Sequence, residues 1–281
     1  HLLAFQRNEI TEYHIYTGIA AITKEPANRE VLGRIAQEEL AHYHIWQRYT
    51  ETEIGPDHLR VLLYTLAARI LGLTFAIRLM EGMEKQAQAA DGSLPALIPE
   101  MPEILAHEES HERDLIALLD EERLRYVGSV VLGLNDALVE FTGTLAGLTF
   151  ALRDARLIAV AGLIMGIAAS LSMGASEYLS QRSETGQTDP FRASIYTGFS
   201  YILTVSLLIL PFLLLTNPYS ALVITLAAAV MVIFLFTFYL SVAKELPFWR
   251  RFFEMTAISL GISAVSFLLG MAIRVVLHVD A

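Results

Sequence analysis

The second half of the chain consists of long apolar stretches separated by short polar ones. Five such stretches follow one another, at 130–152, 157–179, 193–215, 220–243 and 255–277. Each has about the 20 residues that an α-helix needs to cross the hydrocarbon core of a bilayer. The connections between them are short, as in an antiparallel bundle. The pattern predicts five transmembrane helices and a multi-pass membrane protein.

The first half is more polar, and Pro or Gly marks the boundaries of its elements. The pattern predicts four helices, at about 2–23, 27–52, 57–90 and 100–126. The third contains an apolar run as long as a membrane span, but Arg69 and Arg78 favour a buried amphipathic helix. Four long helices in a row indicate an up-down bundle. The chain is therefore predicted to be all-α, with a soluble four-helix domain at 1–126 and a membrane domain at 127–281.

Charge and cysteine content narrow the possible partners. The net charge is -10, and residues 1–127 carry 21 of the 30 acidic residues but only 12 of the 20 basic ones. An acidic soluble domain argues against nucleic acid as a partner. The chain has no cysteine, so disulfides and thiolate-bound metal centres are excluded. Any metal is then held by carboxylate oxygen and imidazole nitrogen.

The distribution of basic residues predicts the orientation in the membrane. The connections after the second and fourth apolar stretches hold five basic residues, against three on the opposite side. This bias predicts that these loops and the N-terminal domain are cytoplasmic. An odd number of spans then places the C-terminus outside. The N-terminal residues HLLAFQRNEI lack the apolar run of a signal peptide.

Two Glu-x-x-His motifs stand out in the predicted bundle. Glu39 and His42 lie on the second helix, and Glu108 and His111 repeat the spacing on the fourth. Residues three apart share a helix face, and carboxylate-bridged di-iron bundles combine two such motifs with one Glu from each of the other helices. The other two helices supply Glu9, Glu81 and Glu84. These seven residues are the predicted ligands of a di-iron site, to which manganese is also suited.

The remaining acidic and imidazole side chains of the bundle are given ordinary roles. A single Glu-x-x-His motif on an acidic helix is more often a solvated pair than a metal site. Acidic and His residues outside the two motifs and the single Glu positions are therefore not predicted to be ligands. The predicted surface charges are Glu12, Glu38, Glu109 and Glu112. The imidazoles predicted to lie at the surface or to support the ligands are His14, His44 and His107.

Residues 9–20, EITEYHIYTGIA, resemble the first helix of the rubrerythrin branch of the ferritin-like superfamily. In that branch the ligand Glu is followed seven residues later by Tyr, which corresponds to Glu9 and Tyr16. The resemblance covers about residues 2–125 and implies a ferritin-like di-iron bundle. Rubrerythrins also carry a cysteine-bound iron domain, which this chain lacks. Iron binding, or iron oxidation by dioxygen, is therefore the expected property.

Acidic and Met side chains inside two apolar stretches suggest an ion path. Asp136 and Glu140 are four residues apart in the first stretch. In the second stretch, Met165, Met173 and Glu177 are separated by eight and by four residues. Intramembrane carboxylates are costly and usually functional, and Gly and Ala beside Met173 permit close helix packing. Carboxylates bind divalent cations and exchange protons, while thioethers favour transition metals. A structural hydrogen-bonding role for the acids and a packing role for the Met residues remain open.

The sequences LGLNDALVEFTGTLAGL and SLSMGASEYLSQRSE resemble the vacuolar iron transporter family. That family has five spans, and the resemblance implies a path between two subunits lined by Asp136 and Met173, with Glu140 and Glu177 as companions. Its iron-sequestering members carry a long acidic, Met-bearing segment after the second span, where this chain has only QRSETGQTDPFRAS. A ferritin-like domain would take that segment's place. The combination resembles the bacterial membrane-bound ferritins.

The leading hypothesis is a homodimeric iron(II) exporter in the bacterial inner membrane, driven by proton antiport. Its cytoplasmic di-iron domain would bind iron and either oxidise or sense it. One alternative is a membrane-anchored ferritin-like ferroxidase or peroxidase that transports nothing. Another is a manganese transporter, because the same ligands suit both metals. Whether the chain is also an enzyme stays open.

Overall fold

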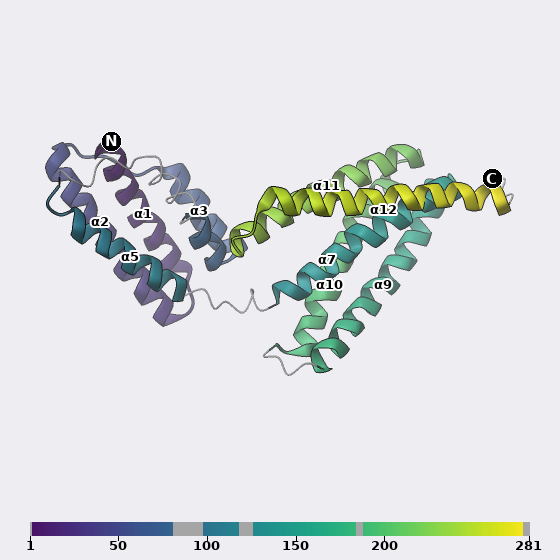
Figure 1. The fold of residues 1–281 in the computed structure, drawn as a ribbon, viewed down its shortest axis with the longest axis horizontal. Helices are drawn as coiled ribbons and strands as arrows, with labels where there is room; N and C mark the ends of the chain where they lie inside the picture. The colour runs from purple at the N-terminus through teal and green to yellow at the C-terminus, as the bar shows by residue number, and fades with distance from the viewer. Residues whose placement is uncertain (1, 81–97, 118–125, 184–187, 278–281) are drawn as a thin grey trace. The chain divides into compact units, whose positions relative to one another are not determined.

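The computed structural model describes residues 2–80, 98–117, 126–183 and 188–277 (Figure 1). Every regular element in these ranges is helical, which confirms the all-α class. The chain divides into two compact units. The first comprises His1–Glu121 and Val242–Glu245, and the second comprises Glu122–Ser241 and Leu246–Ala281.

The first unit is built from helices, and the first two of them follow the predicted ones closely. Its elements are α1 (Leu2–Ile22), α2 (Pro26–Thr50), α3 (His58–Leu71), a helical segment at 73–80, and α5 (Met101–Ala117). Pro lies in the first turn of α2, and the Asp57 side chain accepts hydrogen bonds from the first backbone N–H groups of α3. Helix α1 packs against α2 and α3, and α2 packs against α5. The first two helices were predicted with almost the observed bounds.

The prediction of one continuous helix over 57–90 is wrong. Helix α3 ends at Leu71, and Gly72 has φ 103° and ψ 160°, a backbone conformation that favours glycine. The chain becomes helical again over 73–80. The expected burial holds only after this break, where Phe75 and Ile77 are buried, whereas Ala68 is the one buried residue of α3. Residues 81–90 lie outside the described part of the chain.

The core of the first unit draws on all of these elements. Its largest cluster of buried side chains includes Ile15 and Ile19 of α1, Leu32 and Ile35 of α2, and Ile77. The positions are four residues apart in α1 and three residues apart in α2, so one apolar stripe of each helix faces inward. The stripes hold α1 and α2 at a fixed rotation, which determines where their polar side chains point.

The second unit contains the apolar helices. Its elements are α7 (Val127–Asp136), the π-helical turn η1 (Ala137–Phe141), α8 (Thr142–Leu152), α9 (Ala155–Ser183), α10 (Pro190–Leu214), α11 (Pro218–Ala243) and α12 (Phe248–Leu277). Four helices within the described ranges are long and apolar enough to cross a membrane, and they are α9 to α12. The first predicted span is helical over residues 127–152 but is divided by η1, so its crossing of the bilayer stays a prediction.

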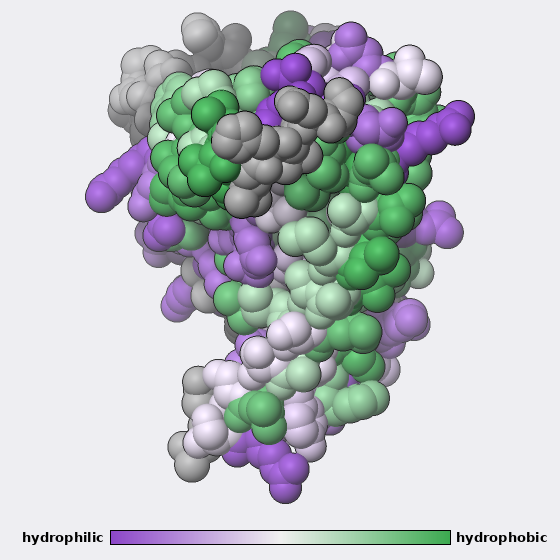
Figure 2. Space-filling view, turned by 90° about the vertical axis from the view of Figure 1, so that its right-hand side faces the viewer, coloured by the Kyte–Doolittle hydropathy of each residue, from purple (hydrophilic) through white to green (hydrophobic). Residues whose placement is uncertain are grey.

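Close approach of backbones organises the second unit. Helix α10 packs against α9 and α7, and α12 packs along α8. A Cβ atom on Gly270 of α12 would lie 2.2 Å from the carbonyl oxygen of Gly147 in α8, so that crossing admits no side chain. Figure 2 shows hydrophobic residues covering much of one face of the molecule, with hydrophilic residues at its margins. Exposed large apolar side chains of this unit include Leu171, Leu214, Val223 and Phe253. Such a surface is suited to lipid.

Candidate metal centre and membrane carboxylates

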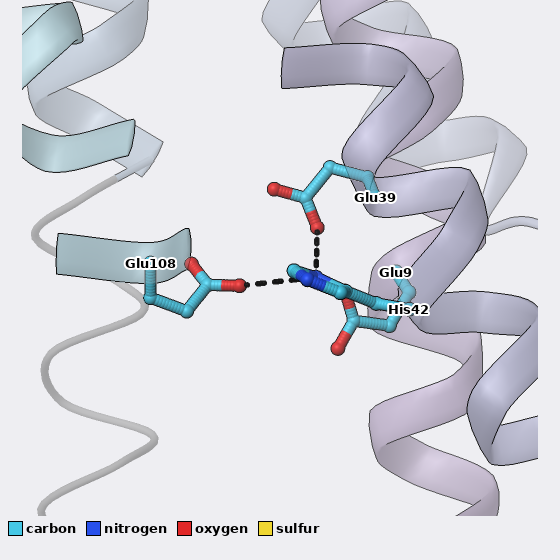
Figure 3. Close-up of side chains that lie close together, drawn as sticks. All are labelled: Glu9, Glu39, His42 and Glu108. Atoms are coloured by element: carbon cyan, nitrogen blue, oxygen red, sulfur yellow. Dashed lines mark ion pairs between the residues drawn. The ribbon is translucent and has the colours of Figure 1, made fainter. Parts of the chain in front are cut away.

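Four side chains from three helices of the first unit converge on one point. Glu9 comes from α1, Glu39 and His42 from α2, and Glu108 from α5. Each offers one donor atom, and these four atoms all lie within 4.8 Å of one another. In Figure 3 Glu108 reaches toward His42 from the side opposite α1 and α2. The group could hold a metal ion.

Helical spacing explains why these polar groups point inward. Leu32, Ile35, Glu39, His42 and Trp46 are all buried, at intervals of three or four residues along α2. Glu39 and His42 therefore occupy positions on the core-facing stripe that apolar side chains hold elsewhere in the helix. The same reasoning applies to α1, where Glu9 is buried on the face that carries the core residues.

His42 is the centre of the cluster. Its Nδ1 lies 3.5 Å from Glu9 Oε2, 3.5 Å from Glu39 Oε2 and 3.5 Å from Glu108 Oε1. His111 of α5 extends the group, since its Nδ1 lies 3.1 Å from Glu39 Oε1 and 3.9 Å from Glu108 Oε2. The second imidazole gives Glu39 a position between two nitrogen donors. A carboxylate in that position is able to bridge two cations.

Several donor atoms of the cluster lack hydrogen bonds although they are buried. Within the part of the chain that the structure describes, this holds for Glu39 Oε2, His42 Nδ1 and His111 Nδ1. The nearby oxygens and nitrogens are close enough for ion pairs but are not aligned as hydrogen bonds. Buried polar atoms are nearly always hydrogen-bonded, so these three atoms require an explanation. Glu39 and His42 belong to the group whose ligand atoms could share one cation, which would give Glu39 Oε2 and His42 Nδ1 a partner. Carboxylate with imidazole is a ligand set that suits iron or manganese.

The electrostatics of the metal-free cluster follow from burial and crowding. Burial raises the pKa of Glu9 well above its usual range, and the neighbouring Glu39 and Glu108 carboxylates raise it further. Burial also raises the pKa of Glu39, but contacts with His111 and His42 outweigh it and lower that pKa to about 2. For His42, burial lowers the pKa, but Glu108, Glu39 and Glu9 raise it to about 12. Without metal, a proton on His42 offsets the negative charge that a cation would otherwise balance.

A set of neighbouring side chains holds these groups in place. The Trp46 indole N–H donates to Glu9 Oε1 at 2.9 Å, and His107 Nδ1 lies 3.1 Å from His42 Nε2. His111 Nε2 lies 2.5 Å from Glu38 Oε2, so the opposite ring nitrogen faces the cluster. Glu38, predicted to be a surface charge, is half-buried and contacts both the exposed Arg34 and the buried His111 imidazole. His107 agrees with the supporting role predicted for it.

Glu81 and Glu84, the predicted ligands from the third helix, lie outside the described residues. Glu9, Glu39, His42, Glu108 and His111 are the five that the structure brings together. Their assignment as metal ligands stays a prediction, which their geometry supports.

In the second unit, Asp136 and Glu140 lie at the junction of α7 and the π-helical turn. Asp136 is the last residue of α7, and Glu140 belongs to η1. Hydroxyl groups support this irregular turn, because the carbonyl oxygen of Leu138 accepts hydrogen bonds from Thr142 Oγ1 at 2.5 Å and from Ser259 Oγ at 2.6 Å. Single π turns within α-helices are frequent at functional sites. Asp136 is half-buried and Glu140 is exposed.

Glu177 of α9 is the most enclosed carboxylate of the second unit among the described residues. Its side chain is buried, with 6% of its surface exposed. Ser129 Oγ of α7 donates to its Oε1 at 2.7 Å, and Gln181 Nε2 donates to the same oxygen at 3.1 Å. Met173, one turn earlier, is half-buried against the apolar core, whereas Met165 is 45% exposed. The predicted stripe of two Met residues and Glu177 is thus divided between interior and surface.

The carboxylates of the second unit do not converge as the first-unit cluster does. Among the described residues, Asp136, Glu140 and Glu177 form no group of donor atoms close enough to share one ion. The roles predicted for these three and for Met173 as a path remain predictions.

Sequence reasoning missed three features of these sites. The contact between Glu177 and Ser129 joins residues 48 positions apart in sequence, and no local pattern signals it. The π-helical turn has no recognised sequence signature either. Trp46 could have been found, since it follows Glu39 by seven residues and so shares its helix face.

Comparison with known proteins identifies part of the second unit. Residues 127–189 match the model of the VIT family, the vacuolar iron transporters. The matched range covers less than a quarter of the chain, and it contains Asp136, Glu140, Met173 and Glu177. None of the curated proteins compared with the chain matches it significantly. Four apolar helices together with a segment typical of a metal-ion transporter family indicate an integral membrane protein that handles metal ions.

Proposed function

We propose that the protein is an iron(II) exporter coupled to proton entry, with a cytoplasmic di-iron domain that binds the metal before export. The observation that carries the proposal is the match of residues 127–189 to the VIT family in a chain whose first unit gathers Glu9, Glu39, His42 and Glu108 within 4.8 Å. Two separate places suited to metal, one soluble and one intramembrane, are what a receptor coupled to a transporter needs.

In the soluble site, each residue has a distinct task. Glu39 lies between the two imidazoles and would hold metal together with them, while Glu9 and Glu108 would supply one further carboxylate each. Trp46 fixes the orientation of Glu9, and Glu38 fixes that of His111. A bound iron pair would supply redox chemistry toward dioxygen. The burial of Glu39 and His42, each 1% exposed, keeps bulk water away from the donors.

In the membrane site, iron(II) and protons are the substrates. Glu177 is a buried carboxylate in an apolar helix, and such groups usually serve the passage of ions or protons. Asp136 and Glu140 offer a second pair of oxygen ligands beside an irregular helical turn. Met173 adds a thioether, which favours transition metals over magnesium or calcium. In this proposal two subunits assemble through the membrane domain, and the path runs between them.

One observation favours a second function, that of a membrane-anchored oxidase. The first-unit cluster is compact and has orphaned donor atoms, whereas the membrane carboxylates do not converge. An oxidase that reacts with iron in the helical bundle and transports nothing through its membrane helices would show that contrast. A manganese exporter is the same proposal with a different cargo, since the ligand set suits both metals.

The deciding experiment is iron(II) flux into proteoliposomes, with and without a pH gradient. The wild-type chain is compared with Asp136→Ala and with Glu254→Ala, which removes an exposed carboxylate as a control. Flux that increases with the gradient, persists in Glu254→Ala and disappears in Asp136→Ala supports the transporter. Absence of flux from folded protein whose bundle still oxidises iron supports the anchored oxidase. Manganese added as competitor separates the two cargoes.

A further inference from the structure

The outer face of α3 carries a continuous stripe of exposed apolar side chains. Its members are between 46% and 65% exposed, and they are Leu59, Leu62, Leu63, Leu66 and Ile70. Their spacing of three, four and seven residues places them on one side of the helix. Single exposed leucines are ordinary on a protein surface, but five on one helix face form a patch. We call these five residues the α3 stripe.

The α3 stripe is not the face by which the helix joins its own unit. The packed face carries Val61, Tyr64 and Ala68, which contact the core of the first unit. A Cβ on Gly18 of α1 would lie 2.9 Å from Thr65 Oγ1, so α1 and α3 approach closely on that side. The apolar stripe therefore faces away from α1, and Leu59, Leu62, Leu63 and Leu66 of it are between 46% and 65% exposed.

The charges around the stripe differ from those of the rest of the first half. Helix α3, HLRVLLYTLAARIL, contains no Asp or Glu, although residues 1–127 hold 21 of them. At 100° per residue, His58 and Arg69 both fall along one edge of the stripe beside Leu62, and both are exposed. An apolar face with an arginine at its edge is suited to a helix that lies in the surface of an anionic bilayer.

We propose that the α3 stripe docks the first unit onto the surface of the bilayer in which the second unit is embedded, with Arg69 against anionic headgroups. The membrane is always close, because ten residue steps join Ala117 of α5 to Val127 of α7, at most about 35 Å of chain. Docking is thus intramolecular and needs only weak intrinsic affinity.

The size of the stripe favours lipid over a second copy of the chain. A helix of 14 residues is about 21 Å long and about 10 Å wide, which corresponds to roughly 200 Å² of face. A stable protein interface buries about 800 Å² on each partner. One helix face falls well short of that, whereas an interfacial helix inserts only its apolar side, to a depth of about 5–10 Å.

The absence of cysteine from the chain makes a direct test possible. The full chain carrying Leu63→Cys is labelled with a fluorophore and placed in nanodiscs of phosphatidylglycerol and phosphatidylcholine. Glu30→Cys, an exposed position on α2, serves as the matched control. We expect lipid carrying a nitroxide near its headgroup to quench the label at position 63, and aqueous iodide to quench only the label at position 30.

Two results would overturn the proposal. Iodide quenching at position 63 as strong as at position 30 would mean that the stripe faces water. A label at position 63 that is shielded from both quenchers would mean that protein, such as a second copy, covers it. Both labelled positions are exposed, so neither variant disturbs the core, and circular dichroism verifies the fold.

A charge variant tests the identity of the lipid. Arg69→Gln removes one basic residue at the edge of the stripe and should lower the ratio of docked to undocked protein roughly fivefold in anionic nanodiscs. For the wild-type chain, the ratio of docked to undocked protein should also be lower in nanodiscs of pure phosphatidylcholine than in anionic nanodiscs. Unchanged lipid quenching under both conditions would overturn the assignment to anionic headgroups.

Discussion

In the first unit, Glu9, Glu39, His42 and Glu108 each bring a donor atom within 4.8 Å of the others, whereas Asp136, Glu140 and Glu177 of the second unit are spread over α7, η1 and α9. The same residue types are thus arranged in two ways. Many converging donors bind a cation tightly and hold it. A path must bind a cation well enough to admit it and weakly enough to release it, which favours a few ligands at successive positions.

The two regions also differ in how far the polar atoms of their carboxylates and imidazoles are hydrogen-bonded. The buried donors of the first cluster include three that lack hydrogen bonds, while the Glu177 carboxylate accepts bonds from Ser129 and Gln181. Buried atoms without hydrogen bonds are suited to binding a cation, whereas the Glu177 carboxylate already has hydrogen-bonding partners. The comparison is therefore tested by variants that change metal binding in the first unit without changing metal transport through the second unit, and the reverse.

The largest expected effect is loss of metal from the first unit in the double variant Glu39→Ala with Glu108→Ala. These side chains contact both imidazoles of the cluster, so their removal leaves too few donors to hold a cation. Elemental analysis of the purified full chain should find the bundle nearly free of metal, while circular dichroism remains that of the wild type because the apolar core is untouched. Glu109→Ala, an exposed neighbour, is the control and should keep its metal. Full occupancy in the double variant would refute the ligand assignment.

The next effect concerns passage. Glu177→Gln keeps the size of the buried side chain but removes its charge, so we expect iron(II) flux in proteoliposomes to fall to the level of protein-free vesicles while the bundle keeps its metal. Ser129→Ala removes a single hydrogen bond to the same oxygen and should reduce flux less. If Glu177→Gln transports like the wild type, Glu177 has a structural role and the path lies elsewhere.

A smaller effect is expected from a residue that supports the cluster. Glu38→Gln weakens the contact with His111 Nε2 that directs the opposite ring nitrogen toward Glu39. Loss of a carboxylate that orients a ligating imidazole typically reduces metal affinity about 10–100-fold. Competition with a chelator measures this in the full chain. Gln37→Ala, an exposed neighbour on α2, should leave the affinity unchanged; an unchanged affinity in Glu38→Gln itself would show that His111 is oriented by other contacts.

How far the sequence predicts this molecule depends on the range of the interactions involved. Helical spacing alone predicts that Glu39 and His42 share a face, and the structure places both on the buried stripe of α2. The break at Gly72 was missed because glycine within an apolar run is compatible with a helix until tertiary packing selects a positive φ. The contact of Glu38 with His111 spans 73 positions, and the spacing within α2 places Glu38 off the buried stripe. Such contacts arise only when helices pack.

A last predicted effect, about tenfold for each pH unit, is the pH dependence of metal binding to the first unit. In the metal-free protein the pKa of His42 is raised to about 12, so its imidazole is protonated throughout the neutral range. The pKa of Glu39 is about 2, so that carboxylate is already ionised and contributes no titration there. Nitrogen must lose its proton before it binds a cation, and metal binding therefore releases at least one proton. Affinity should weaken about tenfold for each unit by which pH is lowered between 8 and 6.

Calorimetry of metal binding in buffers with different ionisation enthalpies counts the released protons. In His42→Gln the affinity should be lower at every pH, and the number of released protons should decrease by one. The membrane carboxylates provide the internal contrast, because Asp136→Ala leaves the cluster intact and should not alter the protons released on binding there. If His42→Gln releases as many protons as the wild type, the imidazole is not the group that the metal deprotonates, and the raised pKa of Glu9 makes that carboxylic acid the next candidate.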